Sequence, residues 1–145
     1  MTQKFILHSA DFPSIYSVAY QAPDHTLVET ERPCKSHVDI LGSFNGILLL
    51  RVSDAELYLW NPSIRVFRKI SPPKGSGIPM YGLGYDSVSD DFKVVRILWP
   101  TNYSCAVHVF SSKLSLWKRI GTFSYYIFFG IVPGMIQVHW DPSGV

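Results

Sequence analysis

Hydrophobic and polar positions alternate on both sides of a short turn in residues 57–70. Leu57 and Leu59 lie in the first alternating run, and Val66 and Ile70 lie in the second. The tripeptide Asn-Pro-Ser between them favours a turn, because Asn and Ser bond their own backbone and Pro presets its φ. The pattern therefore predicts a β-hairpin.

The same pattern returns fifty residues later, in residues 107–120, without a gap. Aromatic residues fill the same two positions in both copies: Trp60 and Phe110, then Phe67 and Trp117. A repeat of this length built from short strands is typical of propeller blades, which bury their faces only against one another. The alternative is a pair of unrelated hairpins in one β-sandwich.

Two nearly all-apolar runs, residues 47–52 and 92–98, predict strands that are buried on both faces. Residues 134–140 have the pattern of the first strand of a further blade. No stretch has a helical period over ten residues, so almost no helix is expected. The predicted fold is all-β: a partial β-propeller of about two four-stranded blades plus the start of a third.

Residues 1–37 are the least regular part. Residues 5–7 form a short apolar run, residues 14–20 alternate like a strand and residues 26–31 alternate weakly, so an edge strand plus loops is expected there. The propeller-like domain is predicted to occupy residues 38–145 and to be truncated at its C-terminus. Residues 71–79 hold three Pro and two Gly and predict a long loop.

Composition narrows the class of protein. Aromatic residues make up 14 % of the chain, and ten Gly and ten Pro suit a turn-rich β-protein. A net charge of +2 is too small to indicate nucleic acid or an anionic membrane as a partner. No run of eighteen apolar residues predicts a membrane span, and residues 1–8 do not have the pattern of a secretory signal.

Cys34 and Cys105 are too few for a disulfide framework. They are expected to be free thiols in a reducing compartment, with Cys105 buried in an apolar strand. The expected location is the cytoplasm, the nucleus or both.

Four segments together resemble a known family. They are residues 42–48 (Gly-Ser-Phe-Asn-Gly-Ile-Leu), 59–65 (Leu-Trp-Asn-Pro-Ser-Ile-Arg), the long motif at 81–96 and the hairpin at 107–120. They resemble, in chain order, the F-box-associated domain of plant F-box proteins, the kelch-like type 1. The N-terminal His8-Ser9 is similar to the S-locus F-box branch.

The resemblance implies a kelch-like β-propeller that captures a protein substrate for a Skp–cullin–F-box ubiquitin ligase, without catalysis and without a cofactor. The F-box itself is not found in residues 1–37, which show no Leu-Pro start and no amphipathic helix. A Skp-type adaptor and a cullin are therefore expected as partners only if an F-box is supplied. Neither nucleic acid nor a membrane is expected as a partner.

Two alternatives stay open. The chain could be a truncated or degenerate fragment of the F-box family without ligase function. It could instead be a kelch-type propeller enzyme of the galactose-oxidase kind, but that enzyme needs a Tyr/His/Cys copper cluster, which is not found in the sequence.

Candidate chemistry is sparse. The five histidines have no metal-ligand spacing with a nearby Cys or carboxylate: His8, His25, His37, His108 and His139. Asp86, Asp90 and Asp91 do not have the spacing of a calcium loop and are read as a solvated turn. No catalytic motif is found, so no catalytic, cofactor-binding or metal site is predicted, and the protein is not expected to be an enzyme.

The predicted site residues fall into two groups. Residues matching family motifs are expected to be structural: Gly42, Asn45, Gly46, Trp60, Asn61, Pro62, Arg65, Gly82, Gly84, Tyr85, Asp86, Asp90, Asp91 and Trp117. Candidate contacts to a protein partner lie in two loops: Lys74, Ser76, Pro79, Asn102 and Tyr103. Basic residues at the hairpin ends are either solvated or bind an acidic partner: Arg65, Arg68, Lys69, Lys118 and Arg119.

Overall fold

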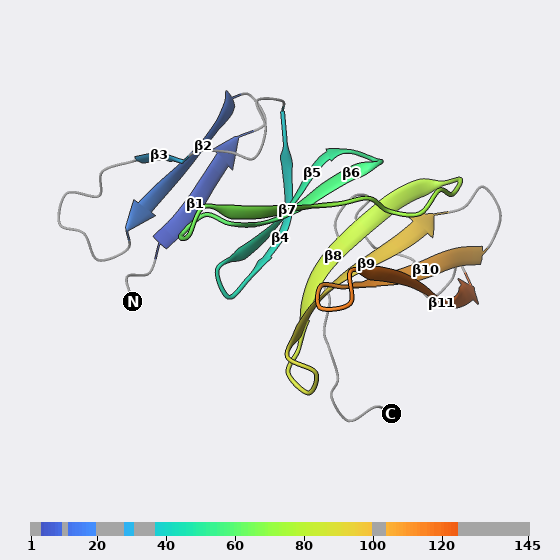
Figure 1. Ribbon diagram of the computed structural model, residues 1–145. Coiled ribbons are helices and arrows are strands. Elements are labelled where there is room, and N and C mark those ends of the chain that lie inside the picture. The colour runs from blue at the N-terminus through green and yellow to red at the C-terminus, as the bar shows by residue number, and fades with distance from the viewer. Residues whose placement is uncertain (1–3, 10–11, 20–27, 31–36, 100–103, 125–145) are drawn as a thin grey trace.

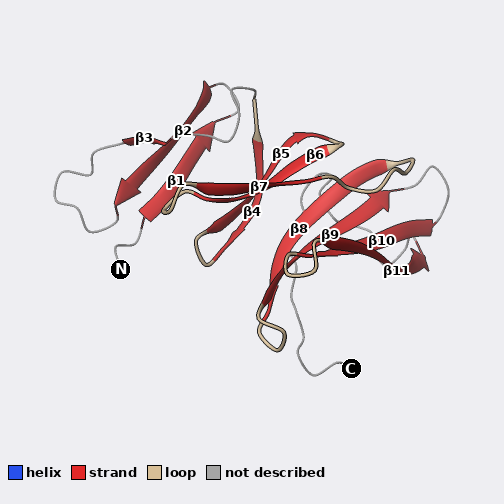
Figure 2. Cartoon of the chain, in the orientation of Figure 1, coloured by secondary structure: helices blue, strands red, loops and turns tan. Residues whose placement is uncertain are grey.

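The computed structural model describes residues 4–9, 12–19, 28–30, 37–99 and 104–124 (Figure 1). These residues contain strands, turns and loops and no helix, which confirms the all-β prediction (Figure 2). The strands are β1 (Lys4–Ser9), β2 (Phe12–Ala19), β3 (Val28–Thr30), β4 (Asp39–Phe44), β5 (Ile47–Ser53), β6 (Glu56–Asn61), β7 (Val66–Ile70), β8 (Ile78–Asp86), β9 (Asp91–Trp99), β10 (Ser104–Ser111) and β11 (Leu116–Ser124).

Two four-stranded antiparallel sheets dominate the described chain. Strands β4 to β7 form the first sheet and β8 to β11 the second, and within each sheet neighbouring strands follow one another in sequence. Each sheet is therefore a simple meander, as expected for a propeller blade. We call them blade 1 and blade 2, and they confirm the prediction of a partial propeller.

The strand register supports the fifty-residue repeat. Trp60 pairs with Phe67 across β6 and β7, and Phe110 pairs with Trp117 across β10 and β11. The turns match as well, because Arg65 and Ser115 both have positive φ, at 56° and 53°. The two hairpins thus share side chains, register and backbone conformation.

Asn45 and Gly46 form the two-residue turn between β4 and β5. Both have positive φ, at 48° and 83°, the conformation that a tight hairpin of this type requires. Asn and Gly are the residues that tolerate this conformation best.

The main core lies between the two blades. Leu41, Leu49 and Leu59 of blade 1 pack in one cluster with Tyr81 and Val94 of blade 2. The opposite face of β5 carries Leu48 and Leu50, which pack in a second cluster, so this strand is buried on both faces as its apolar run predicts.

The innermost strands of the two blades approach closely. A Cβ added to Gly42 of β4 would lie 3.4 Å from Cβ of Leu83 in β8. That distance is at the short limit of ordinary van der Waals contact, so a side chain at this position would fill the space between the two strands.

The N-terminal region contains more strand than predicted. Residues 4–30 contain a three-stranded antiparallel sheet, β1-β2-β3, where the sequence predicted one edge strand. The prediction missed β1 and β3 because both are short and lack clear alternation. Ile15 of β2 is fully buried with Val38, Leu50 and Trp60, so this sheet covers the outer face of blade 1.

One predicted loop ends earlier than expected, and one predicted strand lies outside the described residues. The loop predicted at 71–79 ends at Gly77, because Ile78 and Pro79 already pair with Trp99 and Leu98 in blade 2. The predicted first strand of a third blade, residues 134–140, lies outside the described residues.

The positive φ of Arg65 leads to a stability prediction. A left-handed conformation costs an ordinary residue about 1–2 kcal/mol and a β-branched residue more, whereas Asn tolerates it. We expect Arg65→Val to lower the free energy of unfolding by about 1–2 kcal/mol and Arg65→Asn to leave it unchanged or slightly higher. Urea denaturation measures both, with Ile64→Val as the control at the neighbouring exposed position. Equal stability of the Val and Asn variants would contradict the strain argument.

Candidate protein-interaction surface

Because neighbouring strands in each blade are antiparallel, the turns that join them lie alternately at two opposite ends of the blade. The turn end carries the turns at residues 45–46, 62–65, 87–90 and 112–115. The opposite end, which we call the loop end, carries the turn at 54–55 and the connection at 71–77, both at the upper right of Figure 1.

Two of the five candidate contact residues predicted from sequence lie exposed at the loop end. Lys74 and Ser76 are exposed in the connection between β7 and β8. Pro79 is buried in β8 and is unavailable for contact. Asn102 and Tyr103 lie outside the described residues.

A buried arginine fixes the connection at the loop end. Arg96 of β9 is 3 % exposed, and its Nη1 donates to the carbonyl oxygen of Pro73 at 2.5 Å. Its guanidinium carbon also lies 5.7 Å from the ring centroid of Trp117. The Arg96 side chain thus holds the loop that presents Lys74 and Ser76.

His108 of β10 lies beside this arginine. Nδ1 of His108 is 3.4 Å from Nη2 of Arg96. Burial, together with the positive charges of Arg96 and Arg119, lowers the pKa of His108 below its ordinary value. The imidazole is therefore kept neutral near physiological pH and adds no positive charge to the loop end.

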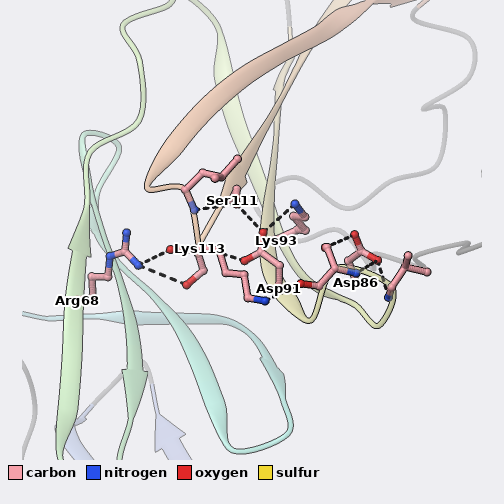
Figure 3. A network of polar contacts seen from close by, with 10 residues as sticks. Arg68, Asp86, Asp91, Lys93, Ser111 and Lys113 are labelled. Atoms are coloured by element: carbon pink, nitrogen blue, oxygen red, sulfur yellow. Dashed lines mark hydrogen bonds and ion pairs between the residues drawn. The ribbon is translucent and has the colours of Figure 1, made fainter.

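At the turn end, Asp91 organises the outer hairpin of blade 2 (Figure 3). Its carboxylate accepts hydrogen bonds from Ser111 Oγ at 2.5 Å and from the backbone N–H of Lys113 at 2.8 Å. Nζ of Lys93 forms an ion pair with it at 2.8 Å. Burial opposes the charged form, but these bonds and the nearby ammonium hold the pKa of Asp91 below its ordinary value.

Asp86 stabilises the neighbouring turn. Its Oδ1 accepts the backbone N–H groups of Val88 at 3.0 Å and of Ser89 at 3.4 Å. Asp86 is therefore bonded to its local backbone, and it is buried rather than solvated as the sequence had suggested. Asp90 accepts a hydrogen bond from the hydroxyl of Tyr85.

Arg68 joins the two blades (Figure 3). Its Nη1 donates to the carbonyl oxygen of Ser112 at 2.6 Å, and its Nη2 donates to Oγ of Ser115. Its guanidinium carbon lies 5.5 Å from the ring centroid of Phe110. The sequence left two interpretations of Arg68: a solvated strand end, or a contact for an acidic partner. Neither describes it, because its guanidinium group binds the other blade.

Exposed apolar side chains gather at the turn end, a feature that the sequence analysis missed. Val88 is 74 %, Leu114 73 % and Ile64 65 % exposed, and each lies in a different turn. Ile64 and Leu114 also occupy matching positions of the two repeats. That recurrence of a bulky apolar residue inside a turn was the signal available in the sequence.

In the described ranges, no group of three or more His, Cys, Asp or Glu side chains could hold a metal ion. No helix within the described part of the chain is long and apolar enough to cross a membrane. Cys105 is a free, fully buried thiol, as predicted, and Cys34 lies outside the described residues.

The chain belongs to the F-box-associated family. The family model for the F-box associated beta propeller domain matches residues 2–132. That match begins before residue 38, where the sequence analysis placed the start of the domain, and this boundary stays a prediction. The likeness of His8-Ser9 to the S-locus branch also stays a prediction.

The chain is similar to several F-box proteins of Arabidopsis thaliana. It is 37 % identical over 133 residues to F-box protein CPR1, an alignment that covers 79 % of this chain and 30 % of that protein. A second F-box protein is 39 % identical over 99 residues, covering 57 % of this chain and 24 % of the relative. An F-box/kelch-repeat protein is 26 % identical over 130 residues, covering 84 % of this chain and 35 % of the relative.

The chain therefore spans about a third or less of the length of these relatives. No solved structure matches it.

Proposed function

We propose that this chain is a protein-binding domain that recognises a substrate for a Skp–cullin–F-box type ubiquitin ligase. The observation that carries the proposal is the family match over residues 2–132, together with relatives that are named F-box proteins. The role is to hold a target protein near the ligase. Ubiquitin transfer itself belongs to partner proteins, and this chain supplies no catalytic group.

The structure supports a binding role through rigidity. The blades share a core, and Arg68 links them at the turn end, so the turns of both blades keep fixed relative positions. Loops and turns held on a rigid scaffold are the usual places for partner contacts. Binding by such a surface loses little conformational entropy, because its backbone is already ordered.

In this role the domain depends on an F-box to reach the rest of the ligase. A Skp-type adaptor and a cullin contact this domain only through an F-box, in the same polypeptide or in an associated one. The complex would act in the cytoplasm, the nucleus or both.

To test this proposal, the 145-residue chain is tagged, expressed in plant cells and recovered under native conditions. Recovered protein is probed for the Skp-type adaptor and cullin, and retained proteins are quantified by mass spectrometry with and without cullin inactivation. We expect at least one retained protein to be ubiquitinated and to become more abundant, by about twofold or more, when the cullin is inactive.

The tag expressed without the chain provides the control for non-specific retention. A folded chain that retains no protein whose abundance depends on the cullin would refute the ligase role and favour a fragment without that function. Recovery of the adaptor without any such protein would also count against substrate recognition.

A further inference from the structure

The loop of residues 71–77, between β7 and β8, is held to blade 2 by few contacts. Apart from two half-buried prolines, its residues are exposed. Outside the strand ladders, one hydrogen bond among the described residues involves this loop: the carbonyl oxygen of Pro73 accepts Nη1 of Arg96 at 2.5 Å. The loop also packs on Leu98, whose Cδ1 would lie 2.5 Å from a Cβ added to Gly75. The Arg96–Pro73 bond is therefore the main polar restraint on the loop.

The burial of Arg96 is only partly compensated. Its guanidinium group donates to Pro73 and lies against the ring of Trp117. Among the described residues it forms no ion pair, and its Nε bonds to no acceptor. Nε1 of Trp117 is likewise buried without a described acceptor. A buried charge with an unpaired donor costs free energy, so water that reaches this site would favour an opened loop.

His108 of β10 supports the position of Arg96 only while its imidazole is neutral. Arginine can only donate, so Nδ1 of His108, at 3.4 Å from Nη2 of Arg96, must be the acceptor. The proton of the neutral ring is therefore on Nε2. Protonation at Nδ1 would turn this acceptor into a donor and would place a second positive charge beside the guanidinium group. The contact would then change from attractive to repulsive.

The charged side chains on the elements around this contact are mainly basic. By element they are Arg96 of β9, Arg119 of β11, Lys74 of the loop, and Arg51 and Asp54, which act on Tyr81 of β8. Burial lowers the pKa of His108, and the charges of Arg96 and Arg119 lower it further. Burial raises the pKa of Tyr81, so that phenol stays neutral where histidine titrates. A proton on His108 in the closed state would therefore face two arginines.

We propose that the Arg96–Pro73 bond is a latch for the 71–77 loop and that protonation of His108 releases it. At neutral pH the latch is closed, and the loop presents Lys74 and Ser76 in fixed positions. On acidification the half-buried imidazole takes up a proton from solvent, Arg96 moves away from it, and the bond to Pro73 is lost. Proton uptake and loop opening are linked, because the open state lets water solvate both cations.

The latch bears on partner contacts at the loop end. Its effect on substrate binding rests on the proposed function, because it regulates the loop that carries the candidate contact residues Lys74 and Ser76. The latch itself depends only on the contacts of Arg96 and His108.

The experiment is NMR spectroscopy of the isotope-labelled, full 145-residue chain between about pH 7.5 and 5. The imidazole carbon shifts of His108 give its titration midpoint, which we expect below pH 6.5. Backbone nitrogen relaxation of residues 74–77 gives their order parameters. We expect order parameters of about 0.85 at neutral pH and below about 0.6 once His108 is protonated, with the same midpoint as the imidazole.

Two variants test the cause of the opening. His108→Asn keeps an oxygen acceptor close to the position of Nδ1 but cannot titrate, so the loop should stay ordered over the whole pH range. His108→Gln is a second replacement that cannot titrate, in case the first does not fold. The matched control is His37→Gln, which removes an exposed histidine paired with Asp39 and should leave the wild-type transition unchanged.

Three results would overturn the latch: a wild-type loop that stays ordered while His108 titrates, a variant at position 108 that loosens as wild type does, or loss of the transition in His37→Gln. The latch and the proposed function fail separately, because order parameters are measured without a partner. Absence of cullin-dependent targets in cells would refute the ligase role and leave the latch standing. Cullin-dependent targets, combined with a loop that does not respond to His108, would do the opposite.

Discussion

Trp60→Ala is expected to lower the free energy of unfolding by about 3–5 kcal/mol, a large part of the stability of an ordinary domain. The Trp60 side chain is 2 % exposed and packs in one cluster with Ile15, Val38 and Leu48. Its removal leaves a cavity at the contact between blade 1 and the N-terminal sheet. Both the lost apolar burial and the lost packing contribute to the cost.

Phe67→Ala is the matched control, because Phe67 pairs directly with Trp60 across the same hairpin but is 50 % exposed. Its truncation should cost about 1–2 kcal/mol, including an edge contact with Tyr58 at 5.9 Å. Urea denaturation followed by tryptophan fluorescence and by far-ultraviolet circular dichroism measures both variants. A cost for Trp60→Ala no larger than that for Phe67→Ala would contradict the placement of the N-terminal sheet over blade 1.

Asp91→Asn is expected to lower the free energy of unfolding by about 2–4 kcal/mol at pH 7. The substitution keeps the shape of the side chain but removes the charge that pairs with Lys93 and strengthens the bonds from Ser111 and Lys113. The buried donors are then left with a weaker acceptor or none. Asp54→Asn, the same change at an exposed carboxylate, should cost less than about 0.5 kcal/mol.

The same variant should reveal a pH dependence. The pKa of Asp91 in the folded chain is below its ordinary value of 3.8, so the unfolded chain binds a proton at this residue more readily than the folded chain does. The stabilisation is therefore complete above pH 3.8 and is lost as the pH falls through the folded pKa. The difference in stability between wild type and Asp91→Asn should be constant from pH 7 to about 5 and should shrink below about 4.

Urea denaturation at a series of pH values measures this difference. A gap that widens on acidification would contradict the lowered pKa. Asp39 has a lowered pKa too, but it titrates equally in wild type and variant and cancels in the comparison.

Much of the fold could be predicted because its determinants are local. The matching aromatic positions of the two hairpins depend on residues within one strand pair, and the predicted hairpins are confirmed. The burial of β5 on both faces follows from its continuous apolar run. The two short strands β1 and β3 were missed, because three to six residues do not establish a period.

The candidate site was less predictable, because it depends on contacts between segments distant in sequence. Arg68 and Arg65 look alike in the sequence as basic residues of one hairpin. In the structure, Arg68 binds the hairpin of the other blade, whereas Arg65 stays exposed. Pro79 was assigned to a contact loop, but its pairing with Leu98 buries it in β8.

The class of fold, the repeat of the two hairpins and the family could all be predicted without a structure, since they depend on the order of apolar residues and turn formers along the chain. Which charged side chains bind inside the protein, and that Asp91 is buried and bonded, followed only from the packing of the sheets. The physical reason is that side-chain availability depends on how two twisted sheets pack against each other. A local pattern specifies each sheet but not the contacts between sheets.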